Sequence, residues 1–153
     1  MTATVHEHSV ATSPPAVYFT RRGTARHEFM ASLLPGIAEQ KLASLIADQS
    51  ACLEQVSPDF IQLRIGKKFL LPRYYDALDL PVELTIRLQN DTRCPSSMTH
   101  VVAELRPLAG ASREVFQARS YFLVRALRYC LLGQDLVRCD EAHDLTPGGS
   151  ESE

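Results

Sequence analysis

The chain has 153 residues, a formal net charge of -2, 45% hydrophobic and 22% charged residues, and no tryptophan. A chain of this length and composition suits one soluble domain around a single core. Its most apolar stretch, 121–133, is interrupted by Arg125 and Arg128, and its polar opening lacks the basic and apolar blocks of a secretory signal. We therefore expect a cytoplasmic protein without membrane association, and we expect its four scattered cysteines to be reduced thiols.

The two ends of the chain differ in composition from its middle. Residues 1–20 combine histidine, serine and threonine with Pro14-Pro15 and show little apolar periodicity, which predicts a flexible N-terminal arm. Residues 146–153 predict a disordered acidic tail. Six acidic residues and one arginine lie from Gly133 onward, so the body of the chain is basic. We expect one domain over 21–145, whose charge is compatible with an anionic partner.

The first folded segment, 24–48, is predicted to form a bent helix. Thr24 is a suitable N-cap, and Pro35-Gly36 interrupts the helical pattern before it resumes up to Asp48. Apolar residues recur at helical spacing on both sides of this break: Phe29, Leu33, Leu34, Ile37, Ala38, Leu42, Leu45 and Ile46. This helix is expected to pack one face on a sheet.

Four strands follow in the pattern of an antiparallel meander. The clearest is 81–90, where apolar and polar residues alternate strictly, as in a half-buried strand. Segments 60–66 and 99–108 repeat the alternation, and 51–56 precedes them as the first strand. The residues predicted to face the core are Ile61, Leu63, Ile65, Val82, Leu84, Ile86, Leu88, Val101, Ala103 and Leu105.

The turn Ser57-Pro58-Asp59 decides where Glu54 points. Proline followed by aspartate favours a type I turn. A simple two-residue loop would place Val56 opposite Ile61 and would direct Glu54 toward the core, whereas a bulge would turn Glu54 to water. We favour the bulge, because an unpaired buried carboxylate is costly.

A long helix is predicted over 113–132, capped by Ser112 and ended by Gly133. Its apolar stripe is assigned to Val115, Ala118, Phe122, Ala126 and Tyr129, with Phe116, Leu123, Leu127 and Cys130 beside them. The predicted fold is therefore α+β with two layers, in which a mostly antiparallel four-stranded meander packs against a long C-terminal helix and a bent N-terminal helix.

The connection 67–80 is the first candidate binding element, because a connection of this length is uncommon unless it is functional or has structure of its own. Its basic side chains are suited to an anionic group and its aromatic rings to flat contact area. The predicted ligand-binding residues are Lys67, Lys68, Phe69, Arg73, Tyr74 and Tyr75. The alternative is that this segment covers one end of the core and closes the sheet edge.

The outward face of the sheet is the second candidate. Alternation places Arg64, Arg87, His100 and Arg106 on this face together with glutamates, so it is a possible weak binder of an anion or of single-stranded nucleic acid. One phenylalanine, Phe60, is too few for a stacking platform, and we expect cross-strand ion pairs in water rather than nucleic acid. Phe60 and Val102 raise the further option of a homodimer formed through the sheet.

Catalytic and metal motifs are incomplete throughout the sequence. Cys94 and His100 would form a thiolate and imidazole pair only if the intervening loop folds back. The pairs His6/His8 and Cys139/His143 each supply two metal ligands, too few for a site, and no glycine-rich phosphate loop occurs. We therefore predict no catalytic residue, no metal and no cofactor.

The sequence favours a small, non-enzymatic module that binds a small molecule or a protein. Its site is expected between the long helix, the sheet and the 67–80 connection. An alternative is an enzyme acting on a hydrophobic anionic substrate, with Arg73 for orientation and His100 or Glu54 for proton transfer. A weak nucleic-acid or anion binder is a second alternative.

Overall fold

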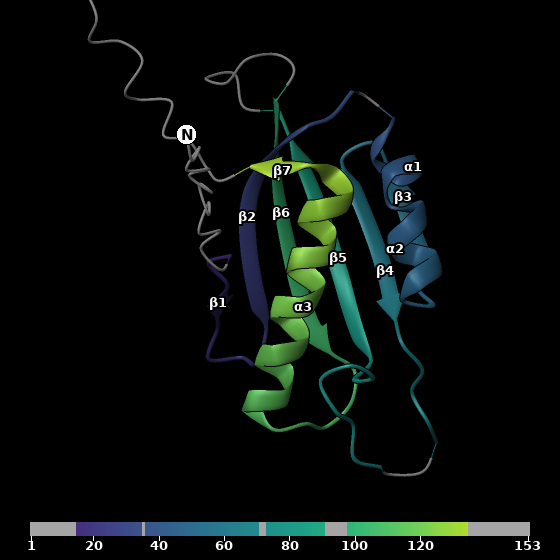
Figure 1. Ribbon diagram of the computed structural model, residues 1–153, viewed down its shortest axis with the longest axis vertical. Helices are drawn as coiled ribbons and strands as arrows, with labels where there is room; N and C mark the ends of the chain where they lie inside the picture. Colours follow the sequence, from purple (N-terminus) through teal and green to yellow (C-terminus); the bar gives the residue numbers. More distant parts are fainter. Residues whose placement is uncertain (1–14, 35, 71–72, 91–97, 135–153) are drawn as a thin grey trace, which may run out of the picture.

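One antiparallel sheet forms the back of the molecule, and its helices lie over one face of it (Figure 1). The computed structural model describes residues 15–34, 36–70, 73–90 and 98–134. The chain follows the order β1 (Tyr18–Phe19), β2 (Ala25–Ser32), α1 (Ala38–Lys41), α2 (Ala43–Asp48), β3 (Cys52–Ser57), β4 (Phe60–Ile65), β5 (Val82–Gln89), β6 (Met98–Pro107), α3 (Arg113–Leu131) and β7 (Gly133–Gln134). The predicted α+β class and antiparallel sheet are confirmed.

The sheet has seven strands in the order β1-β2-β6-β5-β4-β3, with β7 pairing beside β1 on the free edge of β2. Strands β3 to β6 form the meander that the alternating pattern predicted. The predicted inward residues of β4, such as Leu63, and of β6, such as Val101, are buried, and Leu88 of β5 is partly buried. Alternation succeeded here because neighbouring strands and α3 bury one face of each strand.

The prediction of a helix beginning at Thr24 is wrong, because Ala25–Ser32 is strand β2. It pairs with β6 along its whole length, from Ala25 opposite Leu105 to Ser32 opposite Met98. Its inward positions include Ala25, Phe29 and the buried His27, so the period of two is hidden by a small residue and a polar ring. Pairing with β6 overrides the helix preference of its alanine, glutamate and methionine residues.

The second half of the predicted bent helix is helical but divided at Leu42, which ends α1 and precedes α2. Leu42 and Leu45 are buried, so these short helices cover the core beside α3, as the predicted amphipathic pattern required. Of the bend predicted at Pro35-Gly36, Pro35 lies outside the described residues, and Gly36, with a φ of 79°, lies between β2 and α1.

The turn between β3 and β4 combines the two alternatives considered for Glu54. Val56 faces Ile61 across a two-residue loop, and the register shifts between Leu53 and Gln55. Glu54 is the extra residue of this bulge, and Leu53 takes the position opposite Leu63. Glu54 is exposed and lies 3.5 Å from Arg64, so its carboxylate avoids the core as expected.

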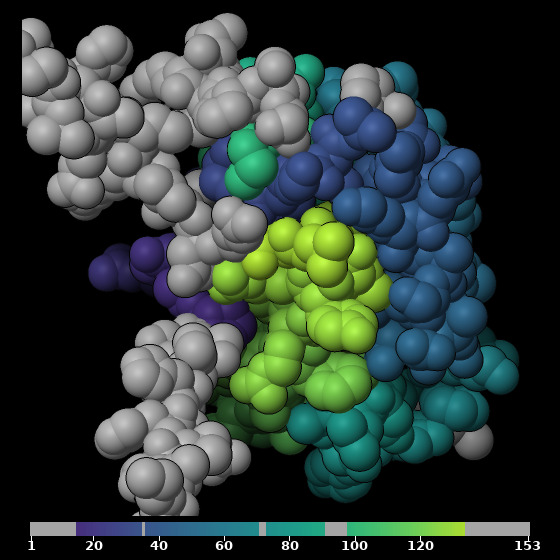
Figure 2. All heavy atoms as spheres, turned by 45° about the horizontal axis from the view of Figure 1, so that its top comes forward, coloured from purple at the N-terminus to yellow at the C-terminus, as the bar shows by residue number. Residues whose placement is uncertain are grey.

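Helix α3 has the predicted start and cap and ends one residue earlier than predicted, and Ser112 Oγ accepts a hydrogen bond from the Val115 N–H at 3.2 Å. Its buried stripe is rotated from the predicted one, because Phe122 and Tyr129 are 42% and 82% exposed. Figure 2 shows the outer surface of α3 between the β1 region and helices α1 and α2. The residues that face the core are Phe116, Arg119, Ser120, Leu123, Val124, Leu127 and Leu131. The sequence did not reveal this stripe, because it contains Arg119 and Ser120 and because other faces of the helix also carry apolar residues.

The end of α3 also differs in detail from the prediction. The left-handed residue is Leu132, with a φ of 53°, whereas Gly133 begins β7. A Cβ at Gly133 would lie 2.5 Å from a ring carbon of Phe29. Gly133 is therefore required for close approach to Phe29 rather than for the helix end.

The N-terminal boundary of the fold lies before residue 21, because Tyr18 and Phe19 pair with β2. His27 Nδ1 lies 2.6 Å from the Ala16 carbonyl oxygen, which ties this segment to the sheet. The rest of the predicted arm, residues 1–14, and the predicted acidic tail lie outside the described residues. Within the described part of the chain, no helix is both long and apolar enough to cross a membrane.

Candidate functional site

Two hollows border the loop between β6 and α3. This loop lies at the lower end of the molecule in Figure 1. The first, here called the loop hollow, has a volume of about 360 Å³. It is lined by Lys68, Phe69, Leu70, Arg73, Tyr75, Ala109 and Gly110. The 67–80 connection thus forms a concave surface with the β6–α3 loop.

Arg73 contacts both aromatic rings that line the loop hollow. Its guanidinium carbon lies 4.4 Å from the ring centre of Phe69 and 5.1 Å from that of Tyr75. One guanidinium nitrogen donates to Asp79 Oδ2 at 2.7 Å. The Tyr75 hydroxyl accepts a hydrogen bond from the Phe69 N–H at 3.1 Å, which joins the start of the connection to its middle. These contacts fix the rings and the cation relative to one another.

A short turn supports Asp79 in this position. Asp76 Oδ1 accepts hydrogen bonds from the N–H groups of Leu78 and Asp79, and Asp79 Oδ1 accepts one from the Asp76 N–H. The hydrogen bond from Leu78 is the main cause that lowers the pKa of Asp76 below its ordinary value. Asp76 is therefore ionised at neutral pH, and its hydrogen bonds with Asp79 hold the turn that carries Asp79 beside Arg73.

Arg119 anchors the same connection from the core side. It is 2% exposed, and its Nε donates to the Leu80 carbonyl oxygen at 3.1 Å. A second nitrogen donates to Gln49 Oε1 at 3.3 Å, just after α2. Burial lowers the pKa of Arg119, and the charges of Asp79 and Asp76 oppose this change. Arg119 therefore ties α3 to both the 67–80 connection and α2.

The structure brings together four of the six predicted ligand-binding residues. Lys68, Phe69, Arg73 and Tyr75 line the loop hollow, whereas Lys67 and the fully exposed Tyr74 do not. The predicted crevice beneath the connection is occupied by buried side chains of the core, including Leu80. The concave surface is displaced toward the β6–α3 loop.

The second hollow, here called the turn hollow, has a volume of about 430 Å³ and was not predicted. It lies between the 20–24 turn and the start of α3. Phe19, Pro107 and Phe116 contribute apolar surface, and Thr20, Arg21 and Arg113 contribute polar groups. The sequence offered one signal for it: the segment TRRGT is a glycine turn that carries adjacent arginines.

The predicted binding residues on the outward face of the sheet are all paired with glutamates. Arg64 lies 3.5 Å from Glu54, Arg87 lies 3.8 Å from Glu104, and Arg106 lies 2.9 Å from Glu83. His100 Nε2 lies 3.1 Å from Glu28 Oε2. This face carries the network of cross-strand ion pairs that the sequence analysis expected.

Glu28 lies between an arginine and a histidine on this face, 2.6 Å from Arg26 and 3.1 Å from His100. Its partial burial raises its pKa, but the hydrogen bond and charge of Arg26, together with His100, outweigh this effect and lower the pKa below 4.5. Arg26 also lies 3.5 Å from Glu104, so the pairs join into a network. Charged groups in such a network are already compensated before any ligand approaches.

The basis for a dimer through the sheet is weaker than predicted. Val102 is 2% exposed, because Glu28 and Arg87 stand opposite it on the two neighbouring strands. It therefore offers no apolar surface to a second subunit, and Phe60 is only partly exposed.

The residues of the predicted enzyme alternative do not converge. Glu54 lies on β3 and His100 on β6, which are three strand positions apart, or about 14 Å at the usual strand spacing. Arg73 lies in the connection beyond the strand ends. Cys94 and the pairs His6/His8 and Cys139/His143 lie outside the described residues. Within the described ranges, no group of three histidine, cysteine, aspartate or glutamate side chains is arranged to hold a metal.

Comparison with known proteins gives a distant likeness in structure alone. No family model matches the chain, and no curated protein matches it significantly. The chain is similar to the crystal structure of protein MLL2253 from Mesorhizobium loti, with 15% sequence identity and a TM-score of 0.47. The match covers 71% of this chain and 96% of that chain. A likeness at this level carries no information about function.

Proposed function

We propose that this protein is a small non-enzymatic binding module that holds a flat, apolar organic anion in the loop hollow. The observation that carries the proposal is the convergence of two aromatic rings and two cationic side chains on one concave surface of about 360 Å³. This volume falls within the range of about 300–1,000 Å³ that is usual for small-molecule sites.

Phe69 and Lys68 are the residues available to a ligand. Phe69 is 48% exposed, although the Arg73 guanidinium already lies over its ring. Lys68 is exposed and forms no ion pair with a carboxylate among the described residues. We assign flat contact to Phe69 and charge attraction to Lys68.

Arg73 and Tyr75 set the geometry of this site. The Arg73 charge is compensated by Asp79, but the guanidinium has five N–H donors and is partly exposed, so it retains donors for a ligand oxygen. Tyr75 is buried and holds the Phe69 backbone. A ligand therefore meets rings and a cation that are already ordered, which reduces the entropy lost on binding.

The carboxylates beside Arg73 are already engaged, since Asp79 pairs with Arg73 and Asp76 holds the turn, and this supports binding over catalysis. Glu54 and His100, the proposed proton-transfer groups of the enzyme alternative, have partners of their own on the outer face of the sheet. General acid and base catalysis needs such groups within hydrogen-bond reach of one substrate.

The test uses 2-naphthoate as the probe and measures its affinity for the full chain by isothermal titration calorimetry. Lys68→Gln and Phe69→Ala should each weaken binding by about tenfold, the loss of one good contact. The matched controls Lys67→Gln and Tyr74→Ala, at neighbouring positions that do not line the hollow, should bind as the wild type does. Absence of binding, or equal losses in the test and control variants, would refute the proposal.

A further inference from the structure

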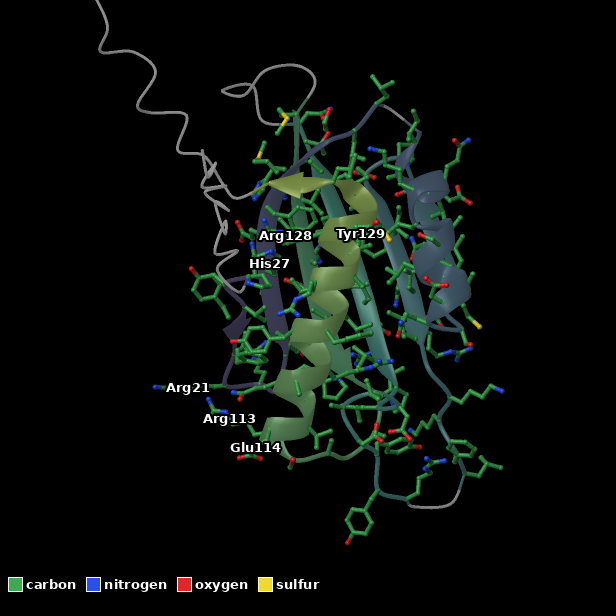
Figure 3. All side chains as sticks on the ribbon, viewed as in Figure 1. Arg21, His27, Arg113, Glu114, Arg128 and Tyr129 are labelled. Carbon is green, nitrogen blue, oxygen red and sulfur yellow. The ribbon has the colours of Figure 1, made fainter. Side chains whose placement is uncertain are left out.

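We infer that the turn hollow is a second, independent site, which binds a small phosphate monoester. Its two arginines come from separate elements: Arg21 lies in the turn between β1 and β2, and Arg113 is the first residue of α3. Figure 3 shows these side chains next to each other on the same side of the molecule.

The charges in this hollow are not compensated by its lining. Neither Arg21 nor Arg113 forms an ion pair with a carboxylate within the described part of the chain, and no aspartate or glutamate is among the lining residues. Glu114 follows Arg113 in the chain but does not line the hollow. Two guanidinium groups without counter-charges in a concave surface attract an anion.

Both arginines extend from ordered backbone. In the turn, the Thr20 N–H donates to the Thr24 carbonyl oxygen at 2.8 Å, and the two threonine hydroxyls lie 2.7 Å apart. Arg113 directly follows Ser112, whose hydroxyl caps α3. That hydroxyl already occupies the Val115 N–H, so the inference rests on the side chains that line the hollow and not on the helix terminus.

The apolar wall indicates that the anion carries an organic group. Phe19 packs edge to face on the nearly buried Phe116, with ring centres 6.0 Å apart, and Pro107 lies beside them. An inorganic anion would leave this wall in contact with water. A ring or short alkyl group beside the anion would cover it and gain from removal of apolar surface from water.

The number of arginines favours phosphate over carboxylate. A phosphate monoester carries a charge of about -1.5 to -2 at neutral pH and presents three acceptor oxygens. Two guanidinium groups match that charge, and each can donate two parallel hydrogen bonds to it. A carboxylate carries a single charge, which one arginine is enough to satisfy. We therefore assign the hollow to a phosphate monoester of a small apolar group.

The experiment titrates the full chain with phenyl phosphate and follows backbone amide resonances by NMR. The resonances of Thr20, Gly23 and Arg113 should shift and saturate, whereas phenol should shift none of them. Inorganic phosphate should bind at least about fivefold more weakly than phenyl phosphate, because it leaves the apolar wall uncovered.

Arg21→Gln and Arg113→Gln should each weaken the binding of phenyl phosphate by about tenfold or more. Arg125→Gln, which removes an exposed arginine of α3 outside the hollow, is the matched control and should leave the affinity unchanged. Lys68→Gln, which changes the loop hollow alone, should also leave the affinity for phenyl phosphate unchanged. No saturable shift, equal affinity for inorganic phosphate, or equal losses in Arg21→Gln and Arg125→Gln would overturn the inference.

Discussion

The outward face of the sheet and the end of the molecule that carries the hollows are both rich in arginine, yet they differ in how that charge is compensated. On the sheet, Arg64, Arg87 and Arg106 each lie within 4 Å of a glutamate. At the turn hollow, Arg21 and Arg113 have no carboxylate partner among the described residues. The number of basic residues on a surface therefore does not identify an anion site, whereas their distance from carboxylates does.

The physical reason for the difference is the strand register. Antiparallel pairing places residues of neighbouring strands opposite one another, so Arg106 meets Glu83 and Glu104 meets Arg26. A turn and a helix start have no such partner strand. Cations there remain available unless the local sequence provides an acid, as Asp79 does for Arg73 in the loop hollow.

The largest expected effect is a loss of stability when Arg119, which anchors the end of the molecule that carries the hollows, is replaced. Arg119→Met keeps the apolar stem but leaves the Leu80 carbonyl and the Gln49 side chain without their donor. We expect the free energy of unfolding to fall by about 2–3 kcal/mol, because hydrogen bonds from a buried charged group are lost. Urea denaturation measures this change.

The exposed Arg125 of the same helix provides the control for that measurement. Arg125→Met should change the free energy of unfolding by less than about 0.5 kcal/mol, as surface substitutions usually do. If Arg119→Met lowered the free energy of unfolding no more than Arg125→Met does, Arg119 would not anchor the 67–80 connection.

Arg119 also shows where sequence reasoning reaches its limit. The meander was predictable because Leu84 and Ile86 alternate with polar residues along β5, and one buried face enforces that period. An arginine and a serine in the buried stripe of α3 broke the helical pattern in the same way that His27 broke the pattern of β2. In both elements a buried polar side chain concealed the inward face.

The candidate sites were predictable only in part, for a related reason. The composition of 67–80 led to Lys68, Phe69, Arg73 and Tyr75, because all four lie in one connection. The turn hollow combines Phe19 and Arg21 with residues about ninety positions away in the chain, such as Arg113. Residues so distant in sequence come together only through the pairing of β2 with β6, which the sequence analysis did not predict.

An intermediate loss of stability is expected when one charge of an ion pair on the sheet face is reversed. One Arg106 nitrogen lies 2.9 and 3.0 Å from the two carboxylate oxygens of Glu83. Arg106→Glu would place two negative charges opposite each other and should lower the free energy of unfolding by about 0.5–1 kcal/mol. Adding Glu83→Arg should restore most of that loss. Thermal or urea unfolding of the single and double variants measures the coupling, and a double variant no more stable than Arg106→Glu would show that the pair is not compensating.

The smallest effect concerns pH and the Glu28 network. Because the folded pKa of Glu28 is lowered below 4.5, its ionised form stabilises the fold fully above that pH, and the contribution is lost as the pH falls through the folded pKa. Glu28→Gln should therefore be less stable than the wild type at pH 7, by less than about 1 kcal/mol for this partly exposed pair, and the difference should narrow below pH 4.5. Urea unfolding at pH 7, 5.5, 4.5 and 3.5 measures the difference, and Glu39→Gln, at an exposed glutamate without an ion pair among the described residues, is the control. A difference that is constant over this range, or that widens in acid, would mean that Arg26 and His100 do not stabilise the Glu28 carboxylate. The charges of the sheet face would then be adjacent without compensating one another, and its contrast with the turn hollow would disappear.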